Sequence, residues 1–521
     1  MPPPAPELRQ SRAGPGTERP ALDSLPRYDF VVIGSGAGGG TLAHELAACD
    51  ARVLLIEAGD WLRPTAPGAG EPLGRYIGDY YPDRSVPIEV VGGQTKFYGA
   101  ALYRYRESDF AAVEHEAGTT PGWPLDYAEL APFYDRVEAV YKVHGDPGLD
   151  RTEPPRGRPL PYSHLPHSPT VARMVARLAD VGAEPAPIPR ALLWQDASGP
   201  CQLCATCDAH LCRVEAKGDT DIAAVRPALA SGRVTLLTRT RALRVLTDPS
   251  GRQATGVEVE REGERAIVPA GGIVVSAGLE ATVALLRRSR TGAWPEGLGN
   301  AGGALGRYLA GHSTGMLFPF VSLRKMADEH TKTFAINQFY HGDSTWRWPL
   351  GVIQMSGQMP MWREVGRAIR PIAHILARHA LTAFYMTEAL PGRDTGFRFD
   401  GDRLVGKQDA IHNMRTFRHM RKLATGMFRQ AGYPVLARRR PPYLWHETGG
   451  ARMGDDPATA VVDRNLAVHG IAGLHVVDAS VLPSAGAVNT GLTIMALASR
   501  LAMHLAGSTV YSDHPEPTAV A

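Results

Sequence analysis

The stretch 28–40 constrains the fold of this chain more than any other segment. A β-type run leads directly into Gly34, Gly36 and Gly39, and a helical segment, Thr41 to Ala48, follows. Strand, glycine-rich turn and helix in this order are the context in which a G-x-G-x-x-G segment binds a dinucleotide. Gly34 makes the tight turn, Gly36 lets backbone approach a pyrophosphate, and Gly39 lets helix and strand pack closely. The pyrophosphate then lies on free N–H groups at the helix N-terminus.

An acidic residue at the expected spacing supports the same site. The predicted strand Arg52 to Ile56 ends in Glu57, about 20 residues after the glycine turn, where a carboxylate accepts a hydrogen bond from a ribose 2′-hydroxyl. The alternative is a glycine-rich turn in an ordinary βα unit, which requires no carboxylate at this position. The combined pattern therefore predicts a Rossmann-type dinucleotide site.

The length and charge of the chain limit its architecture and its partners. With 521 residues the chain exceeds one ordinary core, so we expect at least two domains. A net charge of +3 is too small for this length to indicate binding to nucleic acid or to an anionic membrane. No run of about 20 uncharged apolar residues occurs, so we expect no membrane span. The Pro-, Ala- and Arg-rich start lacks the apolar core of a signal peptide, and we therefore expect a cytoplasmic protein.

Changes in composition divide the chain into five parts. We expect a disordered leader over residues 1–25 and a flexible tail over 508–521. Residues 26–310 form the predicted dinucleotide-binding domain, with the N-terminal and central strands in one sheet. Within it, Asp126 and Glu129 predict a capping box that begins a helix. Residues 311–440, dense in aromatic residues and Met, predict a substrate domain built on an antiparallel sheet with helices on one side. Residues 441–507 then return the chain to the dinucleotide end of the first sheet. The predicted fold class is α/β, and α+β overall.

The returning segment carries a second group of polar and glycine residues. His446 is followed by Glu-Thr-Gly-Gly-Ala-Arg-Met-Gly, and a strand that begins at Leu474 ends in Asp478 and Ala479. A loop leads to Asn489, after which a long helix, Gly491 to Leu505, is expected. A strand that ends in an acidic residue, with small residues and a helix after it, predicts another contact with the dinucleotide.

Together these segments resemble the glucose–methanol–choline oxidoreductases, flavoproteins that oxidise alcohols. The resemblance covers residues 28–505 and rests on the fingerprint with Glu57, the Gly92-Gly93 loop, the segment 306–312, the block 446–454 and the stretch 478–489. It implies that the dinucleotide is FAD. The residues that it places at the cofactor are Gly34, Gly36, Ala37, Gly39, Glu57, Gly92, Gly93, Thr95, Asp478 and Ala479.

The same resemblance implies the catalytic roles. His446 falls on the family's catalytic histidine, and Asn489 falls on its second active-site position. Hydride passes to flavin N5 while a neutral imidazole takes the hydroxyl proton, a contribution of about 10²- to 10⁴-fold in rate. The pKa of histidine, about 6.5, suits this task near neutral pH. Asn489 orients the hydroxyl without a change of charge. His312 also lies in a family motif, and we interpret it as structural.

Two positions depart from the family pattern. Tyr98 stands where many relatives carry Asn, and Thr490 follows Asn489 where Pro is usual. No histidine lies in the loop 92–99, so a histidyl-linked flavin is not indicated.

A cluster of cysteines leaves several interpretations open. Four of the five cysteines lie between residues 201 and 212, at Cys201, Cys204, Cys207 and Cys212. Thiols at this spacing can ligate an iron–sulfur cluster or a zinc ion, with His210 able to replace one thiol at zinc. A redox disulfide and reduced thiols without metal are the alternatives. Some bacterial relatives carry an iron–sulfur cluster in a similar region, which implies electron transfer from the flavin to an external carrier.

The favoured function is FAD-dependent oxidation of a CH–OH group in a polar, sugar-like, amino sugar or polyol substrate. The electron acceptor is O₂, a quinone or a carrier protein. An NAD(P)-linked reductase and a non-catalytic flavin-binding protein are the alternatives. The first does not need the C-terminal return to the cofactor, and the second does not need His446 and Asn489 together.

Overall fold

A computed structural model describes residues 20–22, 25–62, 88–321, 331–357, 367–372, 379–437 and 442–507. Nearly all of the predicted leader and the whole predicted tail lie outside these residues. No helix within the described ranges combines the length and the apolar character that a bilayer crossing requires.

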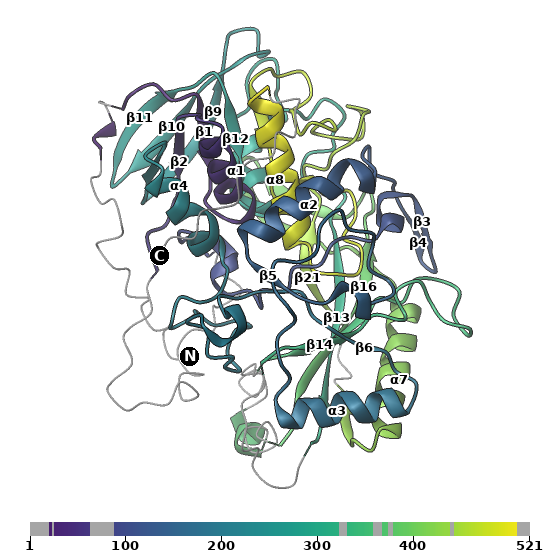
Figure 1. The fold of residues 1–521 in the computed structure, drawn as a ribbon. Coiled ribbons are helices and arrows are strands. Elements are labelled where there is room, and N and C mark those ends of the chain that lie inside the picture. Colours follow the sequence, from purple (N-terminus) through teal and green to yellow (C-terminus); the bar gives the residue numbers. More distant parts are fainter. Residues whose placement is uncertain are drawn as a thin grey trace.

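The first layer is a parallel sheet of five strands in the order β22-β12-β1-β2-β8 (Figure 1). Every neighbouring pair in it is parallel. Most of its residues are buried, so the strands read as apolar runs rather than as alternating patterns. The strands are β1 (Phe30–Ile33), β2 (Val53–Ile56), β8 (Val234–Leu237), β12 (Ile273–Val275) and β22 (Leu474–Val476). The outermost strand, β22, comes from the C-terminal segment.

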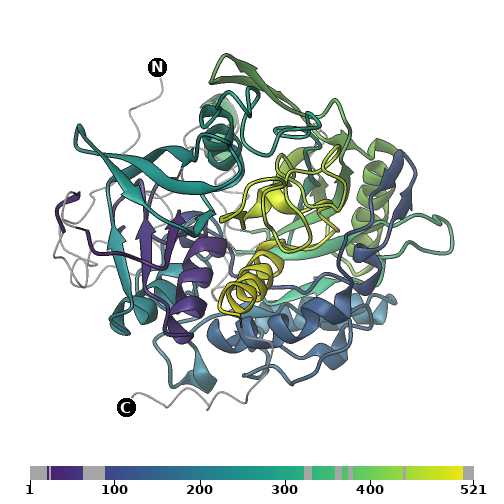
Figure 2. The same cartoon turned by 90° about the horizontal axis from the view of Figure 1, so that it is seen from above.

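Helices α1 (Ala37–Ala48) and α8 (Gly491–Leu505) pack together, and α2 (Tyr127–Val140) lies on the other side of α8 (Figure 2). Helix α8 has the predicted bounds and is buried along most of its length. Helix α1 begins at Ala37, four residues before the predicted start at Thr41. The glycines there are helical because the turn packs against the sheet: a Cβ on Gly38 would lie 1.9 Å from the Val477 carbonyl oxygen.

The expectation that all N-terminal and central strands share one sheet is wrong for the middle of the chain. Strands β9 (Thr240–Thr247), β10 (Ala254–Arg261) and β11 (Glu264–Pro269) form a separate antiparallel sheet. Strand β11 was not predicted. Glu262 and Gly263 both have positive φ, which makes a two-residue hairpin turn matched to strand twist. That turn directs β11 back onto β10.

The second large layer is an eight-stranded sheet whose pairings are all antiparallel. Helices α3 (Pro169–Asp180) and α7 (Met414–Gln430) pack on it through an apolar cluster. The predicted antiparallel sheet with helices on one side is therefore present, but its bounds differ from 311–440, because α3 and one strand come from before residue 311 and another strand comes from after residue 440. Its strands are β6 (Pro185–Pro187), β13 (Ala310–Pro319), β14 (Phe334–Ile336), β15 (Val352–Ser356), β16 (Thr382–Leu390), β19 (Ile411–His412), β20 (Val435–Ala437) and β21 (Tyr443–Thr448).

Shorter elements complete the two layers. Helix α2 begins with the predicted capping box, in which Asp126 accepts from the Glu129 N–H at 2.9 Å and Glu129 accepts from the Asp126 N–H at 3.1 Å. The remaining strands and α-helices are β3 (Val113–His115), β4 (Gly118–Thr120), β5 (Val143–His144), β7 (Arg190–Ala191), α4 (Arg226–Ala230), α5 (Leu279–Arg288), β17 (Gly396–Asp400) and β18 (Arg403–Gln408).

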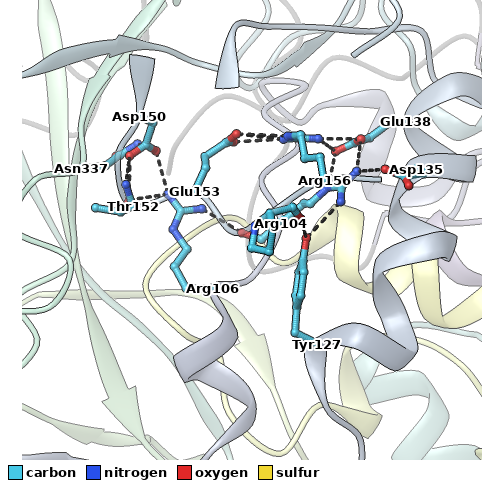
Figure 3. A network of polar contacts seen from close by, with 11 residues as sticks. Arg104, Arg106, Tyr127, Asp135, Glu138, Asp150, Thr152, Glu153, Arg156 and Asn337 are labelled. Atoms are coloured by element: carbon cyan, nitrogen blue, oxygen red, sulfur yellow. Dashed lines mark hydrogen bonds and ion pairs between the residues drawn. The ribbon is translucent and has the colours of Figure 1, made fainter. Parts of the chain in front are cut away.

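A buried network of charges connects the segment after the Gly92-Gly93 loop to α2 and to the eight-stranded sheet (Figure 3). The fully buried Arg104 donates to both oxygens of Glu138, at 2.9 and 2.6 Å, and to Tyr127 at 3.0 Å. Farther along, Asp150 accepts from Arg106 at 2.9 Å and from Asn337, next to β14, at 2.6 Å. Each charge has partners, so the two domains are joined through polar groups that water does not reach.

We predict that Arg104→Met lowers the free energy of unfolding by about 3–5 kcal/mol, because it removes one of the two guanidinium groups that pair with the buried Glu138 carboxylate. The matched control is Arg464→Met, which removes an exposed pair with Glu129 and changes that free energy by less than about 1 kcal/mol. Urea unfolding of the cofactor-loaded proteins gives both values. Equal midpoints for the two variants would show that the network does not stabilise the fold.

Candidate active site

The glycine turn after β1 has the geometry of a dinucleotide cradle. Gly34 has a φ of 98°, and a Cβ there would lie 2.2 Å from the Ser276 carbonyl oxygen. A Cβ on Gly39 would lie 2.0 Å from the Gly34 carbonyl oxygen. Both glycines are therefore required by the turn and by the packing of α1 on β1.

The start of α1 leaves room and hydrogen-bond donors for a ligand. Gly36 is the N-cap residue, with no side-chain cap and no acidic residue in the first turn. The nearest protein atom to a Cβ on Gly36 would be the Gly93 Cα, at 4.0 Å, so protein does not fill that space. Gly36 and Ala37 are half-buried. Helix N–H groups without a partner fit a pyrophosphate.

Glu57 lies directly after β2 and is already held by the glycine turn. One carboxylate oxygen accepts from the Ser35 N–H at 3.1 Å and its hydroxyl at 2.6 Å, and the other accepts from the Gly59 N–H at 2.9 Å. Burial raises the pKa of Glu57. A carboxylate offers about four acceptor positions, so this one keeps capacity for a ribose hydroxyl.

The second glycine loop lies against the first. Gly92 and Gly93 both have positive φ, and the Gly92 N–H donates to the Ser35 hydroxyl at 3.1 Å. Thr95 donates to the Gly92 carbonyl at 2.6 Å and accepts from the Thr220 N–H at 2.9 Å. The backbone at Gly93 is thus presented beside Gly36, where a dinucleotide would pass.

Asp478 organises the turn that follows β22. Its carboxylate accepts from the Ser480 N–H at 2.8 Å, the Gly278 N–H at 3.0 Å and the Thr282 hydroxyl at 2.5 Å. Burial raises the pKa of Asp478. These bonds hold Ala479 and the start of α5 at the carboxyl ends of the parallel strands, where open α/β sheets bind ligands.

His446 occupies a bulge in the second sheet. Strand β21 pairs with β13 at Ala310↔Thr448 and at His312↔Trp445, so the two residues between Trp445 and Thr448 oppose only one. His446 has a φ of 50°, a left-handed conformation that is unfavourable for a residue with a side chain. Such a bulge changes the direction in which a side chain points. Here it brings the imidazole to His312 and Asn489.

A continuous chain of hydrogen bonds passes through His446. The Nδ1 atoms of His312 and His446 are 2.9 Å apart, and His446 Nε2 is 3.3 Å from Asn489 Nδ2. Asn489 Oδ1 accepts from Gln354 Nε2 at 2.9 Å. At the other end, His312 Nε2 lies 3.2 and 3.1 Å from the carbonyl oxygens of Ala485 and Gly486. The two predicted catalytic residues are therefore brought together.

The two carbonyl oxygens determine which atoms carry protons. Carbonyls only accept, so His312 Nε2 carries a hydrogen. Burial lowers the pKa of His312, which keeps this ring neutral. With its hydrogen on Nε2, the neutral ring has a lone pair on Nδ1. His446 Nδ1 must then donate to His312, which leaves His446 Nε2 as an acceptor. An imidazole nitrogen with a lone pair is what abstraction of a hydroxyl proton requires.

Two contributors to this chain of contacts were not identified from the sequence. His312 was interpreted as structural, yet it contacts the catalytic candidate directly. Gln354 was not considered, although it is a polar residue in β15, whose five residues are all buried. A polar side chain within a fully buried strand needs a hydrogen-bond partner. This requirement is the signal by which Gln354 could have been identified.

The cysteine segment does not have the geometry of a metal site. No group of three or more His, Cys, Asp or Glu side chains in the described ranges could hold a metal ion. Burial raises the pKa of Cys201 to about 12 and also raises the pKa of Cys204 and Cys212, which favours the protonated thiol in the metal-free protein. The arrangement of the described side chains therefore does not fit an iron–sulfur cluster or zinc, and no step is assigned to either.

A buried lysine holds this segment instead. Lys217 Nζ donates to the carbonyl oxygens of Lys96, Tyr98, Cys207 and His210 at 2.9, 3.1, 3.0 and 2.7 Å. The ammonium group thus joins the cysteine segment to the second glycine loop.

We predict that Gly36→Val yields a folded protein without bound FAD. The new side chain meets no protein atom but occupies the space beside the helix N-terminus. Flavin absorbance and circular dichroism of the purified variant measure the two properties separately. Gly426→Val is the control, since a Cβ there has no neighbour within 4 Å and the cofactor should be retained. Full flavin content in Gly36→Val would contradict the assignment.

Comparison with known proteins agrees with this geometry. The family models described as GMC oxidoreductase match residues 28–314 and 400–498. The chain is 31% identical to paromamine 6′-oxidase of Streptomyces fradiae, over 93% of this chain and 92% of that protein. It is also 31% identical to 6‴-hydroxyparomomycin C oxidase of Streptomyces lividus, over 92% of each chain.

A solved structure shares the fold. Pyridoxine 4-oxidase from Mesorbium loti superposes with a TM-score of 0.60 at 20% identity, over 92% of this chain and 99% of that one. The two family models and the two relatives at 31% identity show that the chain belongs to the GMC oxidoreductase family and is an FAD-dependent enzyme that oxidises the CH–OH group of an alcohol.

Proposed function

We propose that this enzyme oxidises a hydroxyl group of a polar, hydroxyl-rich small molecule of the amino sugar or polyol class. The support is the naming of the similar proteins. Two act on aminoglycosides by name, and a third, 2-methyl-1,2-propanediol dehydrogenase of Mycolicibacterium austroafricanum, is 27% identical over 92% of this chain and 95% of that protein. Because the similar proteins include both oxidases and a dehydrogenase, the electron acceptor stays open.

His446 acts as the base in this proposal. Bound FAD supplies the hydride acceptor, its N5 atom. His446 Nε2 takes the hydroxyl proton, because its other nitrogen already donates to His312. As the imidazolium forms, that hydrogen bond becomes charge-assisted and holds the ring in place. The single observation that carries the proposal is this contact, at 2.9 Å, which assigns the lone pair to the nitrogen facing Asn489.

Asn489 orients the substrate hydroxyl beside that lone pair. It is half-buried while its neighbours Val488 and Thr490 are buried, which fits a side chain that meets a ligand. As an amide it donates a hydrogen bond without gaining or losing a proton. Holding a reactant in the correct geometry lowers the barrier without any new charge.

The cofactor contacts in this proposal follow the two glycine loops and the two acidic turns. The pyrophosphate lies on the N–H groups at the start of α1. Glu57 would hold the ribose, and the second glycine loop and the turn after β22 would hold the flavin half. The proposed contact residues are Gly34, Gly36, Ala37, Gly39, Glu57, Gly92, Gly93, Thr95, Asp478 and Ala479.

The electrons leave to O₂, a quinone or a carrier protein, and we propose that they do so without a metal cluster. The support is that no group of three or more His, Cys, Asp or Glu side chains in the described ranges could hold a metal ion. Iron and acid-labile sulfide, assayed on protein purified without oxygen, test this proposal. Both are expected to be absent at full FAD occupancy, and stoichiometric amounts of both would overturn it.

We predict that His446→Ala keeps FAD but reduces it about 10²- to 10⁴-fold more slowly, since the proton acceptor is lost. Asn489→Ala should have a smaller effect, because it removes orientation only. Stopped-flow flavin bleaching with an alcohol under anaerobic conditions gives both rates. His164→Ala, at an exposed pair with Asp146, is the control and should match the parent. A parent-like rate in His446→Ala would place the base elsewhere.

The substrate class is tested by the same bleaching assay on the parent enzyme. Amino sugars, sugars, polyols and simple alcohols are compared at equal concentration. We expect the polar, hydroxyl-rich compounds to bleach the flavin faster than simple alcohols. Bleaching by NADPH alone would favour a nicotinamide-linked reductase, and bleaching by none would favour a non-catalytic flavin protein.

A further inference from the structure

We infer that Gln354 is a positioning residue that keeps the Asn489 amide turned with its NH₂ group toward His446. The inference rests on the proposed function, because it concerns the same proton transfer. Gln354 does not touch the reacting atoms. It acts through Asn489, and no role is assigned to it by the family motifs.

The contacts of Gln354 are directional. It is fully buried in β15, and its Nε2 donates to Asn489 Oδ1 at 2.9 Å. Its own Oε1 has no hydrogen-bond partner among the described residues. A buried amide with one unsatisfied oxygen is unfavourable by about 1–3 kcal/mol. The bond to Asn489 is therefore the one polar contact that the side chain makes here.

The sheet holds Gln354 in place. Strand β15 pairs with β16 on one side, with Gln354 opposite Phe384. The Phe384 ring packs edge-on against Trp445 at 5.6 Å, and Trp445 directly precedes His446. The same sheet thus supports the amide donor and the bulge that carries the base.

The direction of every hydrogen bond in this chain follows from its end at His312. The carbonyls of Ala485 and Gly486 make His312 Nε2 a donor, and His446 Nε2 is then an acceptor. Asn489 must present its NH₂ group to that acceptor and its oxygen to Gln354. A donor is therefore required at position 354, and the Gln354 amide supplies it.

A carboxylate at position 354 would reverse this polarity. Glu has nearly the same shape as Gln but only accepts when ionised. The Asn489 NH₂ group would turn to it, and the Asn489 oxygen would face His446 Nε2. That oxygen stabilises a nitrogen that carries hydrogen, so the imidazolium form of His446 would be favoured. The enzyme would then need a higher pH to hold its base in the active form.

The other charged groups around His446 are accounted for. Glu388 and His115 form a pair at 3.3 Å behind His312. Lys332 and Asp208 form a pair at 3.3 Å, with Lys332 over the Phe384 ring. The substitution at 354 leaves both partners of each pair in the chain.

Two further groups complete the surroundings of the base. Glu447, next to His446, is paired with Lys407. Burial raises the pKa of Asp109, behind the loop at Gly486, to about 7, so its titration is present in the parent as well. A shift seen only in a variant at position 354 is therefore caused by the Asn489 amide and the new carboxylate.

The test measures the limiting rate of anaerobic flavin reduction against pH for the parent, Gln354→Glu and Gln354→Met. In Gln354→Glu the acid limb should move upward by about one pH unit or more. In Gln354→Met the limiting rate should fall about tenfold with a smaller change in substrate affinity, since orientation is lost. Gln430→Glu, at the exposed end of α7, is the control and should leave the acid limb unchanged.

The outcomes separate the two proposals. An acid limb at the parent position in Gln354→Glu overturns the positioning role. If that variant does not retain FAD, Gln354→Met decides, and a parent-like rate there overturns the inference. If the parent enzyme is reduced by no alcohol at any pH, the proposed function fails before the role of Gln354 is addressed.

Discussion

The active site depends on one hydrogen bond, between the Nδ1 atoms of His312 and His446. Two imidazoles can make this bond only if one of them donates, and the neighbouring backbone carbonyls determine which. His312 is buried and neutral, so the donor is His446. A base is thereby prepared without a charged partner. A carboxylate in the place of His312 would hold the imidazolium more strongly and make the proton harder to pass on.

The loop that supplies these carbonyls is itself held by buried acids. Glu388 accepts from the N–H groups of Ala485 and Gly486 at 3.0 and 2.9 Å. Tyr340 accepts from the Ala487 N–H at 3.0 Å and donates to Asp109 at 2.7 Å. The N–H groups are fixed on one side, so the carbonyls point to His312 on the other. Left-handed backbone at His446 is tolerated because β13 pairs on both sides of the bulge.

The dinucleotide half of the enzyme was largely predictable from the sequence, for a local reason. The glycine turn, β1, β2 and Glu57 lie close together in the chain, and their spacing reflects short-range geometry. Helix α8 and the capping box of α2 were predicted for the same reason, because caps and apolar periodicity are local properties. The bounds of α1 were less accurate, since glycines have low helix propensity and only contact with the sheet makes residues 38–40 helical.

The sequence by itself determined the family and the cofactor end of the sheet, and it identified His446 and Asn489 as the predicted catalytic pair. All three depend on motifs with characteristic residue types. Tertiary structure alone decided that β11 folds back on β10, that the half-buried cysteines form no metal-binding group with the other described side chains, and that His312 and Gln354 flank the predicted catalytic pair. His312, Gln354, His446 and Asn489 are separated by up to 177 residues along the chain, as their numbers show. Their contacts arise from strand pairing in the second sheet and from the loop before α8, and the direction of each hydrogen bond is set by backbone carbonyls whose positions no local pattern encodes.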